Sequence, residues 1–99
     1  MKIRVLRDAC CAADDQAGPL ELKIELDAPA SLQDLVETVL ASGFLQYSSS
    51  HTSMLGFVDD AVVVRVFSLD YTNAQPHYLV DPATPIGTAV SSGLLDFRF

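Results

Sequence analysis

The stretch LELKIELD, residues 20–27, constrains the fold of this 99-residue chain more than any other. Hydrophobic and charged residues alternate along the whole stretch, which matches the two-residue repeat of a β-strand with one buried face. We therefore expect a strand whose aliphatic side chains face the core and whose charged side chains face water. The expected inward residues are Leu20, Leu22, Ile24 and Leu26.

An amphipathic helix follows directly in APASLQDLVETVLASG, residues 28–43. Ser31 is a favourable N-cap, and Asp34, three residues later, takes the place of the usual Glu in a capping box. Gly43 suits the left-handed residue that ends many helices. The helix is expected to bury one stripe of side chains at helical spacing, formed by Leu32, Leu35, Val36, Val39 and Leu40.

Alternation also predicts strands at both ends of the chain. In KIRV, residues 2–5, Ile3 and Val5 share one face, and we expect this strand to form a hairpin with 20–27 through a long loop. In LLDFRF, residues 94–99, the expected inward side chains are Leu95, Phe97 and Phe99. The loop begins with DACCAADD, residues 8–15, and ends in a Gly-Pro turn signal.

The middle of the chain predicts a second hairpin and a short helical turn. MLGFV and AVVVRVFSL flank Asp59-Asp60, a weaker turn signal than Asn-Gly or Asp-Gly. A short apolar run, HYLV, follows at 77–80. In TPIGTAVSSG, residues 84–93, we expect Thr84 to cap one or two helical turns, with Pro85 in the first position.

The resulting order of elements resembles the ubiquitin-like β-grasp superfamily. The nearest local likenesses are LELKIELDAPASLQDLVETV, a strand that feeds a capped helix, and DPATPIGTAV, a polar lead-in to a short turn. The resemblance implies a single α+β domain over residues 1–99, in the order β-β-α-β-β-(short strand, short helical turn)-β, with a mixed sheet packed on one main helix. It also implies protein binding, because LLDFRF replaces the Gly-Gly tail on which ubiquitin-like conjugation and sulfur carriage depend. An α+β sandwich of another topology is the alternative.

Charge and hydropathy narrow the functional classes. The formal net charge is −7, which disfavours binding to nucleic acid and to anionic membranes, since both depend on basic side chains. No apolar run approaches the ~18 residues of a membrane span. Charged residues at positions 2, 4 and 7 interrupt any signal peptide, so we expect a cytoplasmic protein.

The two cysteines, Cys10 and Cys11, are adjacent. Their Cα atoms, about 3.8 Å apart across a trans peptide, are too close for an unstrained disulfide, and they lack the Cys-x-x-Cys spacing of a redox site. A zinc site would need two further ligands, and the only histidines, His51 and His77, offer no paired spacing. We expect free thiols in a loop, and neither a metal nor another cofactor.

No catalytic constellation is evident. A nucleophile needs a base within hydrogen-bond reach, and Ser48–Ser50 beside His51 is a common loop composition. The chain lacks a glycine-rich phosphate loop and calcium-loop spacing. The sequence favours a non-enzymatic protein, and a small enzyme with a site around His51 or His77 is an alternative.

A partner surface is expected on the sheet face that points away from the helix. If the alternation holds, basic and apolar side chains gather there, a composition enriched at interfaces. The expected binding residues are Arg4, Leu6, Val63, Arg65, Phe67 and Arg98, with Arg4 and Arg98 close together on neighbouring strands. The occupant would be another protein or a second copy of the chain. If the 8–19 loop lies over this face, a partner cannot reach it. A bulge in AVVVRVFSL would reverse the alternation and change which side chains point outward.

A second protein-binding hypothesis uses the acidic residues instead. A small acidic immunity or antitoxin-type protein would plug a basic partner through Asp14, Asp15, Asp59, Asp60 and the acidic helix. Charge reversal of these aspartates would then slow association and weaken its salt dependence.

Overall fold

The computed structural model describes residues 1–8, 20–27, 29–45, 52–68 and 75–99. They form a small α+β domain whose Cα radius of gyration is 12.9 Å, close to the ~13 Å of a folded chain of this length. The strands and helices, in chain order, are β1 (Lys2–Arg7), β2 (Glu21–Glu25), α1 (Leu32–Ala41), β3 (Ser53–Val58), β4 (Ala61–Phe67), β5 (His77–Tyr78), α2 (Ile86–Ala89) and β6 (Leu94–Arg98).

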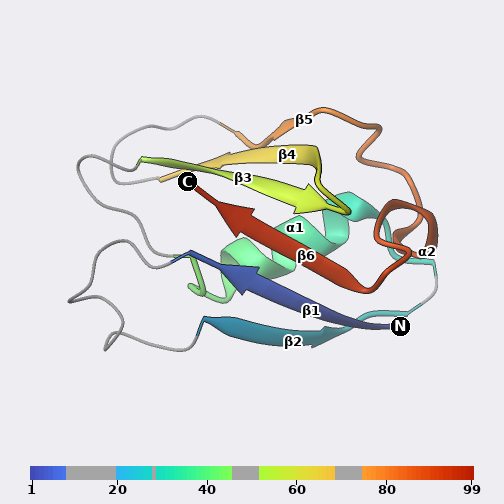
Figure 1. Ribbon diagram of the computed structural model, residues 1–99. Helices are drawn as coiled ribbons and strands as arrows, with labels where there is room; N and C mark the ends of the chain where they lie inside the picture. The colour runs from blue at the N-terminus through green and yellow to red at the C-terminus, as the bar shows by residue number, and fades with distance from the viewer. Residues whose placement is uncertain (9–19, 28, 46–51, 69–74) are drawn as a thin grey trace.

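The strands make one mixed sheet in the order β2-β1-β6-β3-β4-β5. β1 and β6, the first and last strands, lie side by side inside the sheet and run parallel, whereas the other neighbours are antiparallel. α1 crosses behind the sheet in Figure 1, and α2 lies at one end of it. None of the described helices is long and apolar enough to cross a membrane.

Local signals define α1 as expected. The Ser31 hydroxyl accepts a hydrogen bond from the Asp34 backbone N–H at 3.3 Å, and the Asp34 carboxylate accepts one from the Ser31 N–H at 2.9 Å. Gly43, with φ +71°, follows the C-cap residue Ser42. The helix buries Leu32, Leu35, Val36 and Val39 against the sheet. Leu40 is 37% exposed, because α1 ends one residue later and the helical stripe does not extend that far over the sheet.

The core fills the space between α1 and the rear face of the sheet. Its largest fully buried side chains are Ile3, Leu32, Leu35, Met54, Ile86, Leu95 and Phe97. Leu22, Ile24 and Leu26 pack against this core but stay half-buried, because β2 is an edge strand. Leu20 and Phe99 were expected inside; they are 43% and 36% exposed, since each lies beyond the end of its strand.

The hairpin predicted around Asp59-Asp60 is present. β3 and β4 meet in a two-residue turn with φ +50° at Asp59 and +68° at Asp60. Two positive φ values define the type I′ geometry that matches the twist of antiparallel strands. Thr84 does not cap α2. Its hydroxyl donates to the Asp81 carbonyl, and Pro85 is the N-cap without a side-chain hydrogen bond.

Candidate functional site

The front face of the sheet, toward the viewer in Figure 1, has no described helix over it. We call this surface the open face. Strand alternation and register assign its side chains, which are Lys2, Arg4, Leu6, Glu21, Lys23, Glu25, Ser53, Leu55, Phe57, Val62, Arg65, Phe67, His77, Leu94, Asp96 and Arg98. Apolar and charged side chains are interspersed on it, since Asp96 on β6 lies between Leu6 on β1 and Phe57 on β3.

The expected binding residues are mostly on this face. It carries Arg4, Leu6, Arg65, Phe67 and Arg98. Each of these side chains is exposed or half-buried. The strand periodicity was thus sufficient to place five of the six residues.

Val63 is the exception, because β4 carries a bulge. Gly56 pairs with Val64 and Phe57 pairs with Val62, so Val63 has no partner on β3. An extra residue reverses the alternation beyond it. Val63 is 6% exposed and belongs to the core, and Val62 takes the position on the open face.

Arg4 and Arg98 are not close to each other. β1 and β6 are neighbours as expected, but Arg4 pairs with Leu94 at the start of β6. Arg98 lies four residues further along, roughly 13 Å at ~3.3 Å per residue. The two guanidinium groups therefore belong to different parts of the open face.

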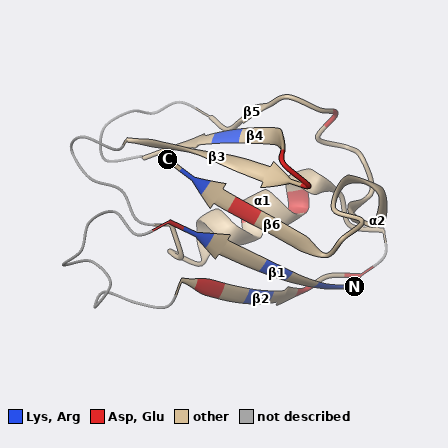
Figure 2. Cartoon of the chain, in the orientation of Figure 1, with Lys and Arg blue, Asp and Glu red and all other residues tan. Residues whose placement is uncertain are grey.

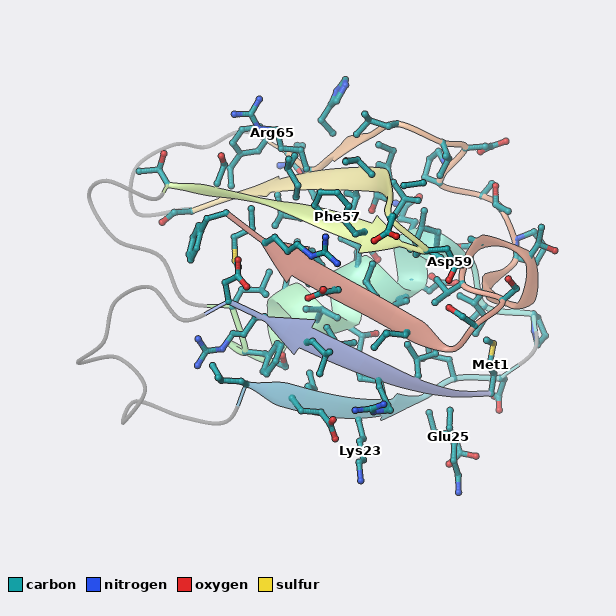
Figure 3. The ribbon with its side chains drawn as sticks, viewed as in Figure 1. Met1, Lys23, Glu25, Phe57, Asp59 and Arg65 are labelled. Atoms are coloured by element: carbon teal, nitrogen blue, oxygen red, sulfur yellow. The ribbon has the colours of Figure 1, made fainter. Side chains whose placement is uncertain are left out.

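Phe57 lies on β3 between Val62 of β4 and Asp96 of β6, and its side chain is labelled on the front of the sheet in Figure 3. The Arg98 guanidinium carbon is 4.5 Å from the centroid of the Phe57 ring, and the Arg65 guanidinium carbon is 5.3 Å from that of Phe67. Both distances are those of cation–π contacts. Each arginine thus covers an aromatic ring that the sheet leaves exposed.

Carboxylates on the same face pair with two of the arginines. Arg4 Nη2 lies 2.8 Å from Glu21 Oε2, and Arg98 Nε lies 2.8 Å from Asp96 Oδ2. The hydrogen bond from Arg4 lowers the pKa of Glu21, and the hydrogen bond to Asp96 raises the pKa of Arg98, so both pairs stay ionised. Figure 2 shows the two signs of charge together on β2 and on β6. The open face is therefore nearly neutral around these pairs.

Arg65 differs from Arg4 and Arg98. Its Nη2 donates to the Ser53 hydroxyl at 3.4 Å, and no described carboxylate lies within ion-pair distance. Arg65 and the neighbouring Phe67 thus form a positively charged, aromatic corner of the open face. A partner carboxylate would meet no competing ion pair there among the described residues.

Leu55 and Phe57 were not among the expected binding residues. The alternation in MLGFV contained the signal, since Met54, Gly56 and Val58 are buried and the residues between them face outward. The alternation places Glu21 and Asp96 on the outward side of their strands. It does not show that Glu21 pairs with Arg4 across two strands, or that Asp96 pairs with Arg98 on the same strand. Those pairs depend on which strands are neighbours, and periodicity within one strand does not determine this.

Arg7 lies on the buried side of β1 and is 4% exposed. Its Nη1 donates to the Asp8 carbonyl at 3.4 Å, and its guanidinium carbon is 5.5 Å from the centroid of the Phe44 ring. Nε is buried without a hydrogen-bond partner, and no carboxylate of the described chain forms an ion pair with Arg7. A buried cation with so few partners costs stability.

The other candidate residues are dispersed or undescribed. Cys10, Cys11, Asp14, Asp15 and His51 lie outside the described residues. His77 is exposed at the start of β5, and Asp59 and Asp60 are exposed in the β3–β4 turn. Within the described ranges, no three His, Cys, Asp or Glu residues form a group that would hold a metal ion.

Comparison with known proteins found no match. No protein-family model, curated protein or solved structure is similar enough to this chain to indicate a relative.

Proposed function

We propose that this chain is a non-enzymatic protein-binding domain, an accessory subunit or adaptor of ubiquitin-like β-grasp type, whose open face docks another protein. Two features support the β-grasp assignment. Parallel first and last strands lie side by side in the sheet, and one main helix crosses its rear face. The proposed fold class does not by itself dictate a function, so we infer binding from the surface.

The observation that carries the proposal is the set of aromatic and aliphatic side chains on a sheet face that no described helix covers. Phe57 and Phe67 lie under arginines, and Leu55 lies on β3 opposite Arg65. Leu94 is on the next strand, β6, and Leu6 is on β1, where Asp96 separates it from Phe57. Aromatic residues and arginine dominate the binding energy of many interfaces. The proposed anchors are therefore Phe57 and Phe67, and the polar rim is formed by the ion pairs around Arg4 and Arg98.

The Arg65–Phe67 corner indicates the chemistry of the partner. Arg65 has no carboxylate neighbour among the described residues, whereas Arg4 and Arg98 are already paired. A partner with an apolar patch and a carboxylate at its border would fill the anchor region and neutralise Arg65. We expect the complex to weaken with increasing salt only modestly, because Arg65 is the one arginine on this face without a carboxylate partner among the described residues.

The test combines partner capture with matched variants. The tagged chain is used to isolate a stoichiometric partner from its source cells, and the affinity of the purified pair is then measured by calorimetry. Phe57→Ala should weaken binding by about tenfold or more, as expected for an aromatic anchor worth ~2 kcal/mol. Arg65→Glu should weaken it as well. Glu37→Ala, an exposed change on α1, is the control and should leave the affinity unchanged.

Hydrogen exchange locates the contact independently of mutation. We expect protection of β3 and β6 amides and of the Arg65–Phe67 segment in the complex. A captured partner that protects α1 instead, and binds Phe57→Ala and Arg65→Glu as tightly as wild type, would refute the open-face proposal.

A further inference from the structure

No described strand neighbours the outer edge of β2, because β2 ends the strand order of the sheet. The opposite edge strand, β5, comprises only two residues, whereas β2 comprises five. An edge strand presents a row of unpaired backbone N–H and C=O groups, which is a template for pairing with another chain. β2 is therefore the longer of the two edges available for such pairing in the described sheet.

The hydrogen bonds between β1 and β2 determine which peptide groups point outward. Met1 N donates to the Leu26 carbonyl at 2.7 Å, and Leu26 N donates to the Met1 carbonyl at 3.0 Å. Arg7 N donates to the Leu20 carbonyl at 3.1 Å, so an even-numbered residue of the β2 segment is again bonded to β1. Antiparallel ladders alternate between bonded and non-bonded pairs, so the even-numbered residues of β2 bond to β1.

The odd-numbered residues Glu21, Lys23 and Glu25 consequently direct their peptide groups to the free edge. The side chains of Lys23 and Glu25 lie along the same edge of the sheet (Figure 3). Lys23 is 80% exposed, with its nearest carboxylate, Glu21, at 3.9 Å. Glu25 has no ion pair with any described residue. Both charges remain available to a strand that pairs there.

The sequence of this edge is complementary to itself in an antiparallel arrangement. A two-fold axis through Ile24 places Lys23 opposite Glu25 of the partner subunit, and Glu25 opposite the partner's Lys23. The same register places Leu22 opposite the partner's Leu26, on the half-buried side of the strand. Opposite charges across a strand pair stabilise it, and like charges destabilise it.

Two of the alternative registers are less favourable. An axis through Lys23 places Lys23 opposite itself and Glu21 opposite the partner's Glu25, so every charged pair is repulsive. An axis through Leu22 pairs Lys23 with the partner's Glu21, a carboxylate already held by Arg4 at 2.8 Å. The Ile24 register brings Glu21 opposite the partner's Asp27, and the Arg4 ion pair neutralises Glu21 there.

We propose that two copies of this chain pair antiparallel through β2, with the two-fold axis at Ile24, to form one continuous sheet. Isologous pairing of this kind is the commonest symmetry of homodimers. The inference is separate from the proposed function, because the dimer uses the edge of the sheet and leaves the Phe57–Phe67 region of the open face exposed on each copy.

Sedimentation of the full chain over a range of concentrations tests the proposal. Wild type should dimerise reversibly. Lys23→Glu and Glu25→Lys should each weaken the dimer by roughly tenfold or more, because each converts two attractive pairs into two repulsive ones. The double variant, which exchanges the two charges, should restore dimerisation. Arg65→Glu is the matched control, since it changes charge by the same amount as Lys23→Glu on a distant strand.

A proline variant tests the backbone pairing directly. The Lys23 N–H points to the free edge and is not part of the β1 ladder, so Lys23→Pro should abolish the dimer while the monomer stays folded, as judged by circular dichroism. A wild-type chain that stays monomeric up to near-millimolar concentration would overturn the proposal. A dimer that persists in Lys23→Glu, Glu25→Lys and Lys23→Pro would also overturn it. Loss of partner binding in Arg65→Glu with an intact dimer would separate this proposal from the proposed function.

Discussion

Gly56 lies where three strands leave no room for a side chain, and an added methyl group there would measure how tightly they pack. It is on the buried side of β3, paired with Val64 on β4 and with Phe97 on β6. A Cβ atom on Gly56 would lie 2.7 Å from Val64 Cγ1 and 3.1 Å from a carbon of the Phe97 ring. Carbon atoms pack at about 3.5–4.0 Å, so one or both neighbours would have to move by close to 1 Å.

Neither neighbour can move cheaply. Val64 and Phe97 are both 0% exposed, and Val64 is β-branched with a restricted χ1 angle. Overpacking a tight core costs about 1–3 kcal/mol, and two crowded neighbours favour the upper half of that range. We therefore expect Gly56→Ala to lower the free energy of unfolding by about 2–3 kcal/mol. At about 4–8 °C per kcal/mol for a chain of this size, the Tm should fall by roughly 10–20 °C.

A double-mutant cycle identifies the clash as the cause. Val64→Ala alone leaves a cavity, but in the Gly56→Ala background the new methyl group partly fills it. Denaturant unfolding should therefore show that the double variant loses at least ~1 kcal/mol less than the sum of the single losses. Gly87→Ala is the control, because its Cβ meets nothing within 4 Å. Equal effects of Gly56→Ala and Gly87→Ala, or additive losses in the cycle, would refute the packing argument.

Two further stability predictions follow from backbone geometry and buried charge. Asp60→Gly should raise the free energy of unfolding by about 0.5–1 kcal/mol, because φ +68° strains a residue that has a Cβ. The substitution also removes the 3.8 Å ion pair with Arg98, but that pair is highly exposed and contributes little. A less stable variant in chemical denaturation would contradict this prediction. Arg7→Met should raise the free energy of unfolding by about 1–2 kcal/mol, because it keeps an unbranched side chain beside Phe44 and removes a buried Nε that has no hydrogen-bond partner. A Tm below that of wild type would show that the guanidinium is better satisfied than its contacts indicate.

The elements that could be predicted are those whose signals are local. The Ser31–Asp34 capping box, Gly43 after the helix and the alternation of Ile3 and Val5 all concern residues within one element, and each appears as expected. The Asp59-Asp60 turn was also located, because strand-like runs flank it on both sides, and aspartate tolerates the positive φ observed there better than most residues do.

The misplaced residues depended on non-local structure. The bulge at Val63 arises from how β4 pairs with β3, and nothing in AVVVRVFSL distinguishes it from a regular strand. The distance between Arg4 and Arg98 depends on the register of β1 against β6. Knowing that these two strands are neighbours does not determine that register. The ion pair between Arg4 and Glu21 likewise requires the β1–β2 pairing.

The parallel pairing of β1 with β6 also determines how the molecule would respond to force. Because the strands run parallel, the start of β1 and the end of β6 lie at opposite ends of the sheet (Figure 1). Tension applied between these two points would slide one strand along the other in shear. Every hydrogen bond between β1 and β6 would then carry load at the same time, whereas an antiparallel pair pulled from adjacent ends would open one bond after another.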